Sequence, residues 1–489
     1  MRTPLPPRGG KSILGHDHTS DNVSDMNSER SRRSFLEEMG LFSAGVLGVP
    51  YLSGGGSRDV EVLPGTHDRG EYGANDQINI ALIGAGVMGQ NDAGAALQNS
   101  GTQLVAACDL YDSRLERCQE RWGEDVFTTR DYREVISRDD VDSVIIATSD
   151  HWHDQITIDA LNAGKHVYCE KPMVHKIEEG YDVIEAEKNS DPLLQVGSQS
   201  TSSLLNVKAR ELFKGGAIGE PVLAEYATNR NSMLGAWNYS MPPSAGPENI
   251  DWDMYLEDLP EMPFSAEKFF RWRKYRNFGT GVAGDLFVHN LSALHFILDS
   301  LGPERIYGTG GIRFWEDGRE VPDVMTALLD YPETENHSAF NCALRVNFKD
   351  GSVSSTWGNY PARIVGTEGE MVFKGGEMIL RKSPTPNVPA MSIDNFSKDI
   401  RESFKEYHKS KYPDQIPRVT EEKVYKTADE GLGDTALHHK TLLDAIRGKG
   451  EIVQDGEFGL RAAAPALAAN TSYFDGTAVN WDPVEMQVV

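Results

Sequence analysis

The sequence predicts an α/β protein of two domains, in which a parallel, doubly wound sheet is followed by an α+β domain with a large open, mostly antiparallel sheet. Between residues 76 and 200, short apolar runs alternate with segments of helical pattern. From residue 201 to about 430, longer runs alternate apolar and polar residues. The first pattern is typical of a parallel sheet covered on both faces, and the second of strands with one covered face. The helical tail, residues 431–489, is expected to return to the first domain.

A glycine-rich turn follows the first predicted strand, residues 78–83, and precedes a helix. Gly84 permits a tight turn, Gly86 lets backbone N–H groups approach a pyrophosphate, and Gly89 lets the helix pack close to the strand. This spacing in this context predicts a Rossmann dinucleotide-binding domain. The cofactor-binding residues expected at the turn are Gly84, Gly86, Val87, Met88 and Gly89.

An acidic residue, Asp109, ends the next predicted strand. At about this distance after the glycines, a carboxylate holds the ribose hydroxyls of the adenosine half of the cofactor. Its charge would repel a 2′-phosphate. Asp109 therefore favours NAD over NADP.

Composition excludes several classes of protein. The 489 residues carry a formal net charge of -26, so the clustered Lys and Arg that bind nucleic acid or anionic membranes are not expected. No apolar run is long enough for an internal membrane span. The four cysteines have neither metal-ligand nor disulfide spacing, so we expect buried free thiols and no metal site.

Residues 1–75 have the composition of a leader and linker. The segment Ser31-Arg32-Arg33-Ser34-Phe35-Leu36 precedes a modest apolar stretch, residues 39–52, which is the form of a twin-arginine export signal. We expect export to the periplasm or cell envelope, with the signal either cleaved or kept as an anchor. The alternative is a chance arginine pair before an amphipathic helix.

Two polar segments, residues 149–153 and 170–172, follow predicted strands of the first domain. Ligands of open α/β sheets lie outside the carboxyl ends of the strands, so both segments are placed where a nicotinamide could lie. We expect one of the two histidines to contact cofactor or substrate and the other to pack or face solvent. The cofactor-binding residues expected here are Ser149, His151, His153, Glu170 and Lys171.

The second domain contains a glycine-rich stretch, residues 279–284, that opens a helix. Asp285 and His289 stand four residues apart, on one face of that helix. The antiparallel sheet around it would keep one face uncovered. Such a face usually finds a partner, so we expect a homo-oligomer, dimer or tetramer, built on the sheet.

Glu170-Lys171-Pro172, combined with the Asp285-x-x-x-His289 pattern, resembles the glucose-fructose oxidoreductase and inositol dehydrogenase (Gfo/Idh/MocA) family. The resemblance covers roughly residues 77–485. It implies that Lys171, Asp285 and His289 form the catalytic group. Residues 149–153 look like the segment that lies beside the nicotinamide in that family.

The same roles follow from chemistry. Oxidation of a secondary alcohol by a nicotinamide needs a base for the hydroxyl proton and a cation that stabilises the developing alkoxide. His289 is the expected base, because its unperturbed pKa lies near neutrality. Lys171 is suited to hold the hydroxyl oxygen, and Asp285 to orient the imidazole or bind a second hydroxyl. Each residue alone also has a structural explanation, as a surface lysine, a helix charge or a packed histidine.

Aromatic, amide and guanidinium side chains recur beyond residue 197 and suit a polyol ring, which offers apolar C–H faces and many hydroxyls. For any single residue, a packed loop at a subunit interface is an equal explanation. The candidate substrate contacts are Gln199, Arg271, Trp272 and Tyr275.

Three functions fit these patterns. The first is a dehydrogenase that moves a hydride between NAD and a ring hydroxyl of a sugar, polyol or glycoside. The second is an NAD-dependent glycosidase that acts by oxidation, elimination and hydrolysis; one branch of the resembling family works this way and typically lacks the lysine present here as Lys171. The third is a binding protein with a structural cofactor. Because free NAD is scarce outside the cytoplasm, an exported enzyme is expected to hold its cofactor tightly.

Overall fold

The first domain is a six-stranded sheet in which every neighbouring pair is parallel. The computed structural model describes residues 59–68, 70, 72–73, 76–257, 259–352, 361–383, 388–413 and 421–489. The strand order is β4-β3-β2-β5-β6-β7. The strands are β2 (Ile78–Ile83), β3 (Thr102–Cys108), β4 (Phe127–Thr129), β5 (Ser143–Ile146), β6 (His166–Glu170) and β7 (Leu194–Gly197).

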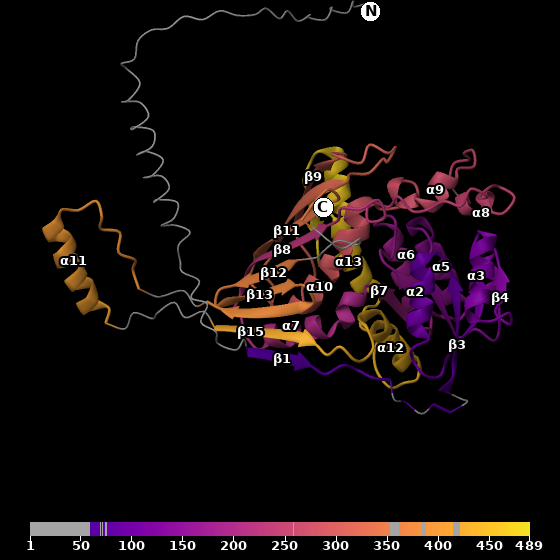
Figure 1. The fold of residues 1–489 in the computed structure, drawn as a ribbon, viewed down its shortest axis with the longest axis horizontal. Helices are drawn as coiled ribbons and strands as arrows, with labels where there is room; N and C mark the ends of the chain where they lie inside the picture. Colours follow the sequence, from indigo (N-terminus) through magenta and orange to yellow (C-terminus); the bar gives the residue numbers. More distant parts are fainter. Residues whose placement is uncertain are drawn as a thin grey trace, which may run out of the picture. The chain divides into compact units, whose positions relative to one another are not determined.

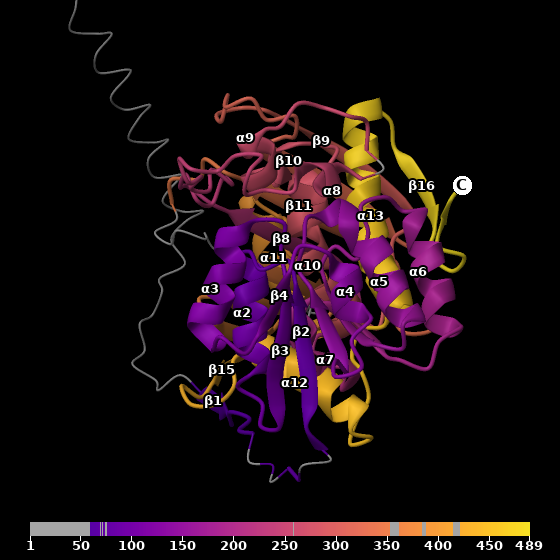
Figure 2. The same cartoon turned by 90° about the vertical axis from the view of Figure 1, so that its right-hand side faces the viewer.

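Helices cover both faces of this sheet (Figure 2). On one face lie α2 (Val87–Ala96), α3 (Asp112–Trp122) and, from the C-terminal tail, α12 (Asp434–Ile446). On the other lie α4 (Tyr132–Ile136), α5 (His153–Asn162) and α6 (Glu179–Lys188). Burial on both sides explains why all four residues of β5, one serine and three apolar residues, are buried. The tail helix α12 is fixed to β7 by the side chain of Gln195, which donates to the carbonyl of His438.

The second domain is built on an eleven-stranded sheet (Figure 1). Among the strands that the structure describes in this sheet, β1 pairs with β15 and β8 with β11 in parallel, and the other pairs are antiparallel. In spatial order the strands are β1 (Asp59–Leu63), β15 (Glu421–Thr427), β14 (Glu377–Lys382), β13 (Gly369–Lys374), β12 (Ala362–Gly366), β8 (Pro221–Asn229), β11 (Phe340–Asn347), β10 (Val324–Tyr331), β9 (Arg305–Gly311), β16 (Val479–Asp482) and β17 (Gln487–Val488).

One face of this sheet packs against α7 (Leu204–Lys214), α10 (Val288–Leu298) and α13 (Gly456–Asp475). The approach of α13 is very close, since a Cβ added at Gly308 of β9 would lie 2.2 Å from the carbonyl oxygen of Ala469. On the opposite face, Tyr307 and Leu328 are paired across β9 and β10 and are 44% and 55% exposed. The sequence-based fold class is therefore confirmed.

The structure corrects the expected extent of the N-terminal linker, since β1 lies within residues 1–75. Val60 and Val62 alternate with acidic residues, and the strand extends the sheet beside β15, where Glu61 forms an ion pair with Lys423 at 2.8 Å. The twin-arginine segment lies outside the described residues. The charged excursion after β14 contains a helix, α11 (Lys398–Lys411).

An insertion between β8 and α10 packs on the first domain. It contains α8 (Trp252–Leu256), α9 (Ala266–Phe270) and the short turn η4 (Trp272–Lys274), around a cluster of aromatic side chains. Backbone hydrogen bonds join it to the first domain, from Asp251 N to Leu110 O and from Asp112 N to Asn249 O. The ring of Tyr111 meets that of Phe270 edge-on at 5.4 Å.

All four cysteines are buried and free, as the sequence predicts. Among the helices that the structure describes, none combines the length and the apolar composition that a membrane crossing needs.

Candidate active site

The glycine-rich turn connects β2 to α2, and its three glycines serve different purposes. Gly84 has a φ of +91°, and a Cβ there would lie 2.6 Å from the carbonyl of Ala147 in the neighbouring connection. At Gly89, a Cβ would lie 2.0 Å from the carbonyl oxygen of Gly84. At Gly86, a Cβ would meet only the guanidinium of Arg114, at 3.8 Å. Packing therefore requires Gly84 and Gly89, whereas Gly86 keeps a space open above the turn.

That space faces the N-terminus of α2. The helix begins at Val87, which is 71% exposed, and Met88 is partly exposed. The first backbone N–H groups of a helix have no partner within it, and its N-terminus favours an anion. No acidic side chain stands in the first turn of α2. The turn thus fits the pyrophosphate of a dinucleotide.

Asp109 lies at the end of β3, buried beside the turn. Its carboxylate accepts hydrogen bonds from the backbone N–H groups of Ala85 at 2.8 Å and Tyr111 at 2.9 Å. The guanidinium of Arg114 lies 3.2 Å from Oδ2 and also stacks on the rings of Phe269 and Phe270. The carboxylate of Asp109 therefore fixes the glycine turn through the N–H of Ala85. The guanidinium of Arg114 lies beside the position expected for the ribose.

A cavity of about 590 Å³ lies against the turn, Asp109 and Ser149. Its far wall comes from the insertion and is largely apolar. The insertion residues that line it include Leu234, Met241, Tyr255, Phe269, Phe270 and Trp272. A ligand bound at the sheet edge would therefore also contact the second domain.

The expected catalytic lysine and aspartate meet in the structure. Lys171 follows β6, and Asp285 lies in a π-helical turn directly before α10. Lys171 Nζ donates to Asp285 Oδ1 at 2.9 Å and to its backbone oxygen at 3.1 Å. Arg273 Nε donates to the same Oδ1 at 3.1 Å. His289, on the first turn of α10, is partly exposed, and neither ring nitrogen hydrogen-bonds to a residue that the structure describes.

The charges around this group set its protonation. Burial alone would raise the pKa of Asp285, but Lys171, Arg273 and Arg230 hold it well below its usual range. For His289, burial and the same three cations lower the pKa to about 3, against the opposite effect of Asp285. At neutral pH the site therefore holds a carboxylate and an uncharged imidazole. The structure does not show the expected hydrogen bond between Asp285 and His289, because the carboxylate faces the cations.

The two histidines after β5 are both anchored. A ring nitrogen of His151 lies 3.0 Å from the carbonyl oxygen of Tyr255, and burial lowers its pKa to about 4. His153 is fully buried, with Nδ1 at 2.8 Å from the carbonyl oxygen of Pro172. His153 thus braces the chain beside Lys171, and His151 joins the insertion to the first domain.

Glu170 is buried beside the lysine and receives a hydrogen bond of 2.6 Å from the amide of Gln199. That amide also donates to the hydroxyl of Tyr168 at 3.2 Å. Burial, and then the nearby carboxyl of Asp92, raise the pKa of Glu170 well above its usual range. The amide nitrogen of Gln199, a candidate substrate contact, is therefore already engaged in hydrogen bonds to Glu170 and Tyr168.

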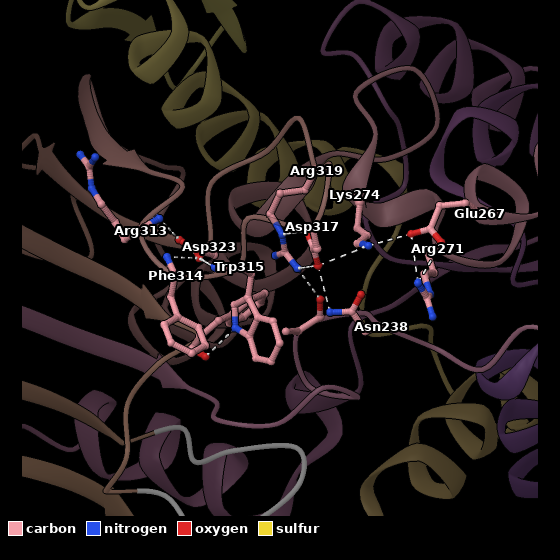
Figure 3. Close-up of polar contacts among 12 residues, drawn as sticks. Asn238, Glu267, Arg271, Lys274, Arg313, Phe314, Trp315, Asp317, Arg319 and Asp323 are labelled. Atoms are coloured by element: carbon pink, nitrogen blue, oxygen red, sulfur yellow. Dashed lines mark hydrogen bonds and ion pairs between the residues drawn. The ribbon is translucent and has the colours of Figure 1, made fainter.

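The other candidate substrate residues lie in the insertion. Arg271 donates hydrogen bonds to Glu267 at 2.8 Å and to the carbonyl oxygen of Tyr239 at 2.8 Å. It therefore belongs to the group of polar contacts drawn in Figure 3. Tyr275 is buried in the aromatic cluster. Trp272 lines the cavity, and the guanidinium of Arg273 stacks on its ring, with Cζ 4.1 Å from the ring centroid.

Arg273, Arg230 and Arg114 were not singled out by the sequence. Arg273 and Arg230 stand in runs of similar residues, and only the turn η4 decides that Arg273 rather than Arg271 meets Asp285. No cluster of three His, Cys, Asp or Glu side chains in the described part of the chain is arranged to hold a metal ion.

Family comparison matches both domains. Residues 78–198 match the NAD-binding Rossmann fold of an oxidoreductase family, and residues 210–481 match the C-terminal α/β domain of the same family.

Curated relatives align with part of the chain. Inositol 2-dehydrogenase from Salmonella typhimurium is 32% identical over 149 residues, which are 30% of this chain and 44% of that protein. A glycosyl hydrolase family 109 protein from Shewanella baltica is 27% identical over 207 residues, 40% of this chain and 45% of that protein. The chain thus spans less than half the length of either relative.

Solved structures share the fold. The NAD binding oxidoreductase from Klebsiella pneumoniae superposes with a TM-score of 0.57 at 21% identity, over 83% of this chain and 99% of that chain.

Proposed function

The chain belongs to the Gfo/Idh/MocA family of oxidoreductases, and from that premise we propose that it transfers a hydride between a nicotinamide cofactor and a ring hydroxyl of a sugar, polyol or glycoside. The observation that carries the proposal is the pairing of Lys171 with Asp285 beside the imidazole of His289, which hydrogen-bonds to none of the described residues. The group lies at the same sheet edge as the open glycine turn.

Each residue has a role that its environment supports. Lys171 donates a hydrogen bond to the hydroxyl oxygen and stabilises negative charge as the alcohol is oxidised. His289, uncharged at neutral pH, accepts the hydroxyl proton. Asp285 holds the lysine in place. A dinucleotide whose pyrophosphate is held at the glycine turn would supply its nicotinamide as the hydride acceptor.

The cofactor residues of this proposal are the glycine turn, the start of α2 and Asp109. We expect NAD, since the Asp109 carboxylate stands where a 2′-phosphate would be repelled, although Arg114 offsets part of its charge. Titration of the protein with both reduced nucleotides tests this. NADH binding about tenfold tighter than NADPH binding, or 1.4 kcal/mol, supports it, and the reverse order contradicts it.

Tight retention of the cofactor is supported by the enclosing insertion. The wall formed by Tyr255 and Phe270 covers the cavity, and Arg114 ties that wall to the first domain. Release of nucleotide only on denaturation of the purified protein is the expected result. Protein that emerges free of nucleotide and needs a large excess of NAD contradicts it.

The glycosidase remains the second candidate because of the family 109 relative. In that reaction, oxidation is transient and the hydride returns to the sugar, so no reduced cofactor accumulates. A panel of sugars, polyols and aryl glycosides separates the two. Accumulation of NADH supports the dehydrogenase, and release of the aryl alcohol without NADH supports the glycosidase.

Export and assembly complete the proposal. Arg32 and Arg33 support the twin-arginine route, and mass analysis of the mature N-terminus after expression in a bacterium tests it.

The exposed Tyr307 and Leu328 support a homo-oligomer through the open sheet. A Leu328→Asp variant that stays oligomeric in sedimentation analysis would refute that interface.

A further inference from the structure

One short segment of the insertion, residues 269–273, makes contacts at both ends of the strand edge where the cofactor is expected. Its first two side chains, Phe269 and Phe270, lie against the guanidinium of Arg114, whose Cζ is 5.4 and 5.3 Å from the ring centroids. Arg114 in turn pairs with Asp109 at 3.2 Å, directly after β3. In a Rossmann domain this position belongs to the adenosine half of the dinucleotide.

The last side chain of the segment reaches the candidate catalytic residues. Arg273 Nε donates to Asp285 Oδ1 at 3.1 Å, and the same oxygen accepts a hydrogen bond of 2.9 Å from Lys171, directly after β6. In the sheet, β2 and β5 lie between β3 and β6. Because these strands are parallel, their carboxyl ends share one edge, with the glycine turn between the two contacts. The segment therefore follows the path expected for the cofactor from its adenosine to its nicotinamide.

Trp272 is the residue of this segment next to Arg273, and it lines the cavity of about 590 Å³. The guanidinium of Arg273 stacks on its ring, with Cζ 4.1 Å from the centroid. The six-membered ring also packs on the backbone at Gly279, where an added Cβ would lie 2.9 Å from Cε3. The indole is thus held by two neighbours, yet it remains partly exposed.

Other aromatic side chains of the cavity are less accessible to a ligand. Phe269, Phe270 and Tyr255 are 5%, 8% and 4% exposed. Among the described aromatic residues that line the cavity, only Trp272 and Tyr239 are partly exposed. The indole N–H of Trp272 donates to none of the residues that the structure describes. A ring that is ordered by its neighbours and still accessible suits contact with a second flat π-system.

We infer that Trp272 is a cofactor contact, and that its indole packs against the nicotinamide end of the bound dinucleotide. The reacting end of the cofactor has to lie beside the residues that handle the alcohol, and Arg273 joins Trp272 to that group. The inference rests on the proposed hydride transfer and adds a residue to it. It also replaces the substrate contact that the sequence suggested for Trp272.

The test compares the affinities of the full chain for NADH and ADP-ribose. Both nucleotides carry the adenosine, the pyrophosphate and the second ribose, and only NADH carries the nicotinamide. The variants are Trp272→Leu, Trp272→Phe and Arg273→Gln. Calorimetric titration, after exchange of any co-purified nucleotide, measures binding without turnover.

The chain offers a matched control in Trp122→Leu. Trp122 is also partly exposed and also lies under a guanidinium, that of Arg121, whose Cζ is 4.7 Å from the ring centroid. It is the last residue of α3 and does not line the dinucleotide cavity. Its substitution removes an equivalent stacked indole away from the expected cofactor.

Trp272→Leu should weaken NADH binding by about 10-fold and leave ADP-ribose binding unchanged. This lies toward the lower end of the range for loss of an aromatic ring stacked on a base, because leucine keeps part of the apolar contact. Trp272→Phe should keep most of the NADH affinity, and Trp122→Leu should keep all of it. Arg273→Gln should lower kcat while NADH affinity is retained.

Three outcomes overturn the inference. An equal loss for NADH and ADP-ribose in Trp272→Leu shows that the indole does not act at the nicotinamide. Unchanged NADH affinity with a raised KM for the sugar makes Trp272 a substrate contact. A loss of NADH affinity in Arg273→Gln as large as that in Trp272→Leu shows that the indole only supports Arg273.

Failure of the proposed function gives a different result. If no sugar reduces NAD, hydride transfer to sugars fails, whereas selective weakening of NADH binding in Trp272→Leu still supports the contact. If the wild type binds neither nucleotide, both the cofactor and the contact are refuted.

Discussion

Substitution of Gly86 by alanine should separate cofactor binding from folding. Gly86 has extended backbone angles, φ -70° and ψ -170°, which alanine also adopts. Its added Cβ would meet only Arg114 at 3.8 Å, so the fold has room for it. The same methyl group would occupy the space in which a pyrophosphate approaches the turn. The variant should fold with only a small loss of stability and bind NADH poorly.

The chain offers a matched control at Gly433. Both glycines are helix N-caps without a side-chain cap, and Gly433 has φ -72° and ψ 166° with no atom within 4 Å of an added Cβ. Alanine is the poorer N-cap at either site, so each substitution should cost the fold about 1 kcal/mol. Only Gly86→Ala should also lose hydrogen bonds to the pyrophosphate. Two such bonds at about 1.5 kcal/mol each correspond to roughly 100-fold weaker binding.

Fluorescence titration with NADH and urea unfolding of the nucleotide-free forms measure the two effects. Gly433→Ala should bind NADH as the wild type does. If Gly86→Ala bound NADH as tightly as Gly433→Ala does, the glycine turn would not be the pyrophosphate site.

The remaining predictions concern the turn and the candidate catalytic residues. Gly89→Ala should lower the free energy of unfolding in urea by about 1–3 kcal/mol, because its Cβ would lie 2.0 Å from a backbone carbonyl oxygen; unchanged stability would contradict this packing. Lys171→Met should lower kcat by about 10²- to 10³-fold while leaving NADH affinity intact, since the lysine acts on developing charge; a change confined to KM would refute that role. Because the pKa of His289 is lowered to about 3, the base form persists as pH falls, so kcat/KM should not decline between pH 8 and about pH 5; a midpoint near the ordinary value of about 6.5 would contradict the environment described for His289.

Local pattern was sufficient to predict the nucleotide domain. The run that forms β2, the glycines after it and Asp109 at the end of β3 all lie within 32 residues, from Ile78 to Asp109, and each element depends on its own sequence. The alternating runs of the second domain likewise predicted β8, β10 and β11. Strand β1 was missed because five residues next to a long polar leader carry little periodic signal, and its partner β15 is more than 300 residues away.

The candidate site was predictable only in part, because its contacts are tertiary. The pairing of Lys171 with Asp285 spans 114 residues, and nothing in either segment indicates that Arg273 joins them. The choice between Arg271 and Arg273 depends on one short turn, which directs the first toward Glu267 and the second toward Asp285. Likewise, no local pattern shows that Gln199 is held by Glu170.

The most direct test of the central claim is the absorbance of reduced nicotinamide when the protein and NAD are mixed with the panel of sugars, polyols and aryl glycosides. The wild type should form NADH with at least one sugar, and Lys171→Met and His289→Ala should not. Glycoside cleavage without NADH, or NADH formation that both variants retain, would contradict hydride transfer at this site.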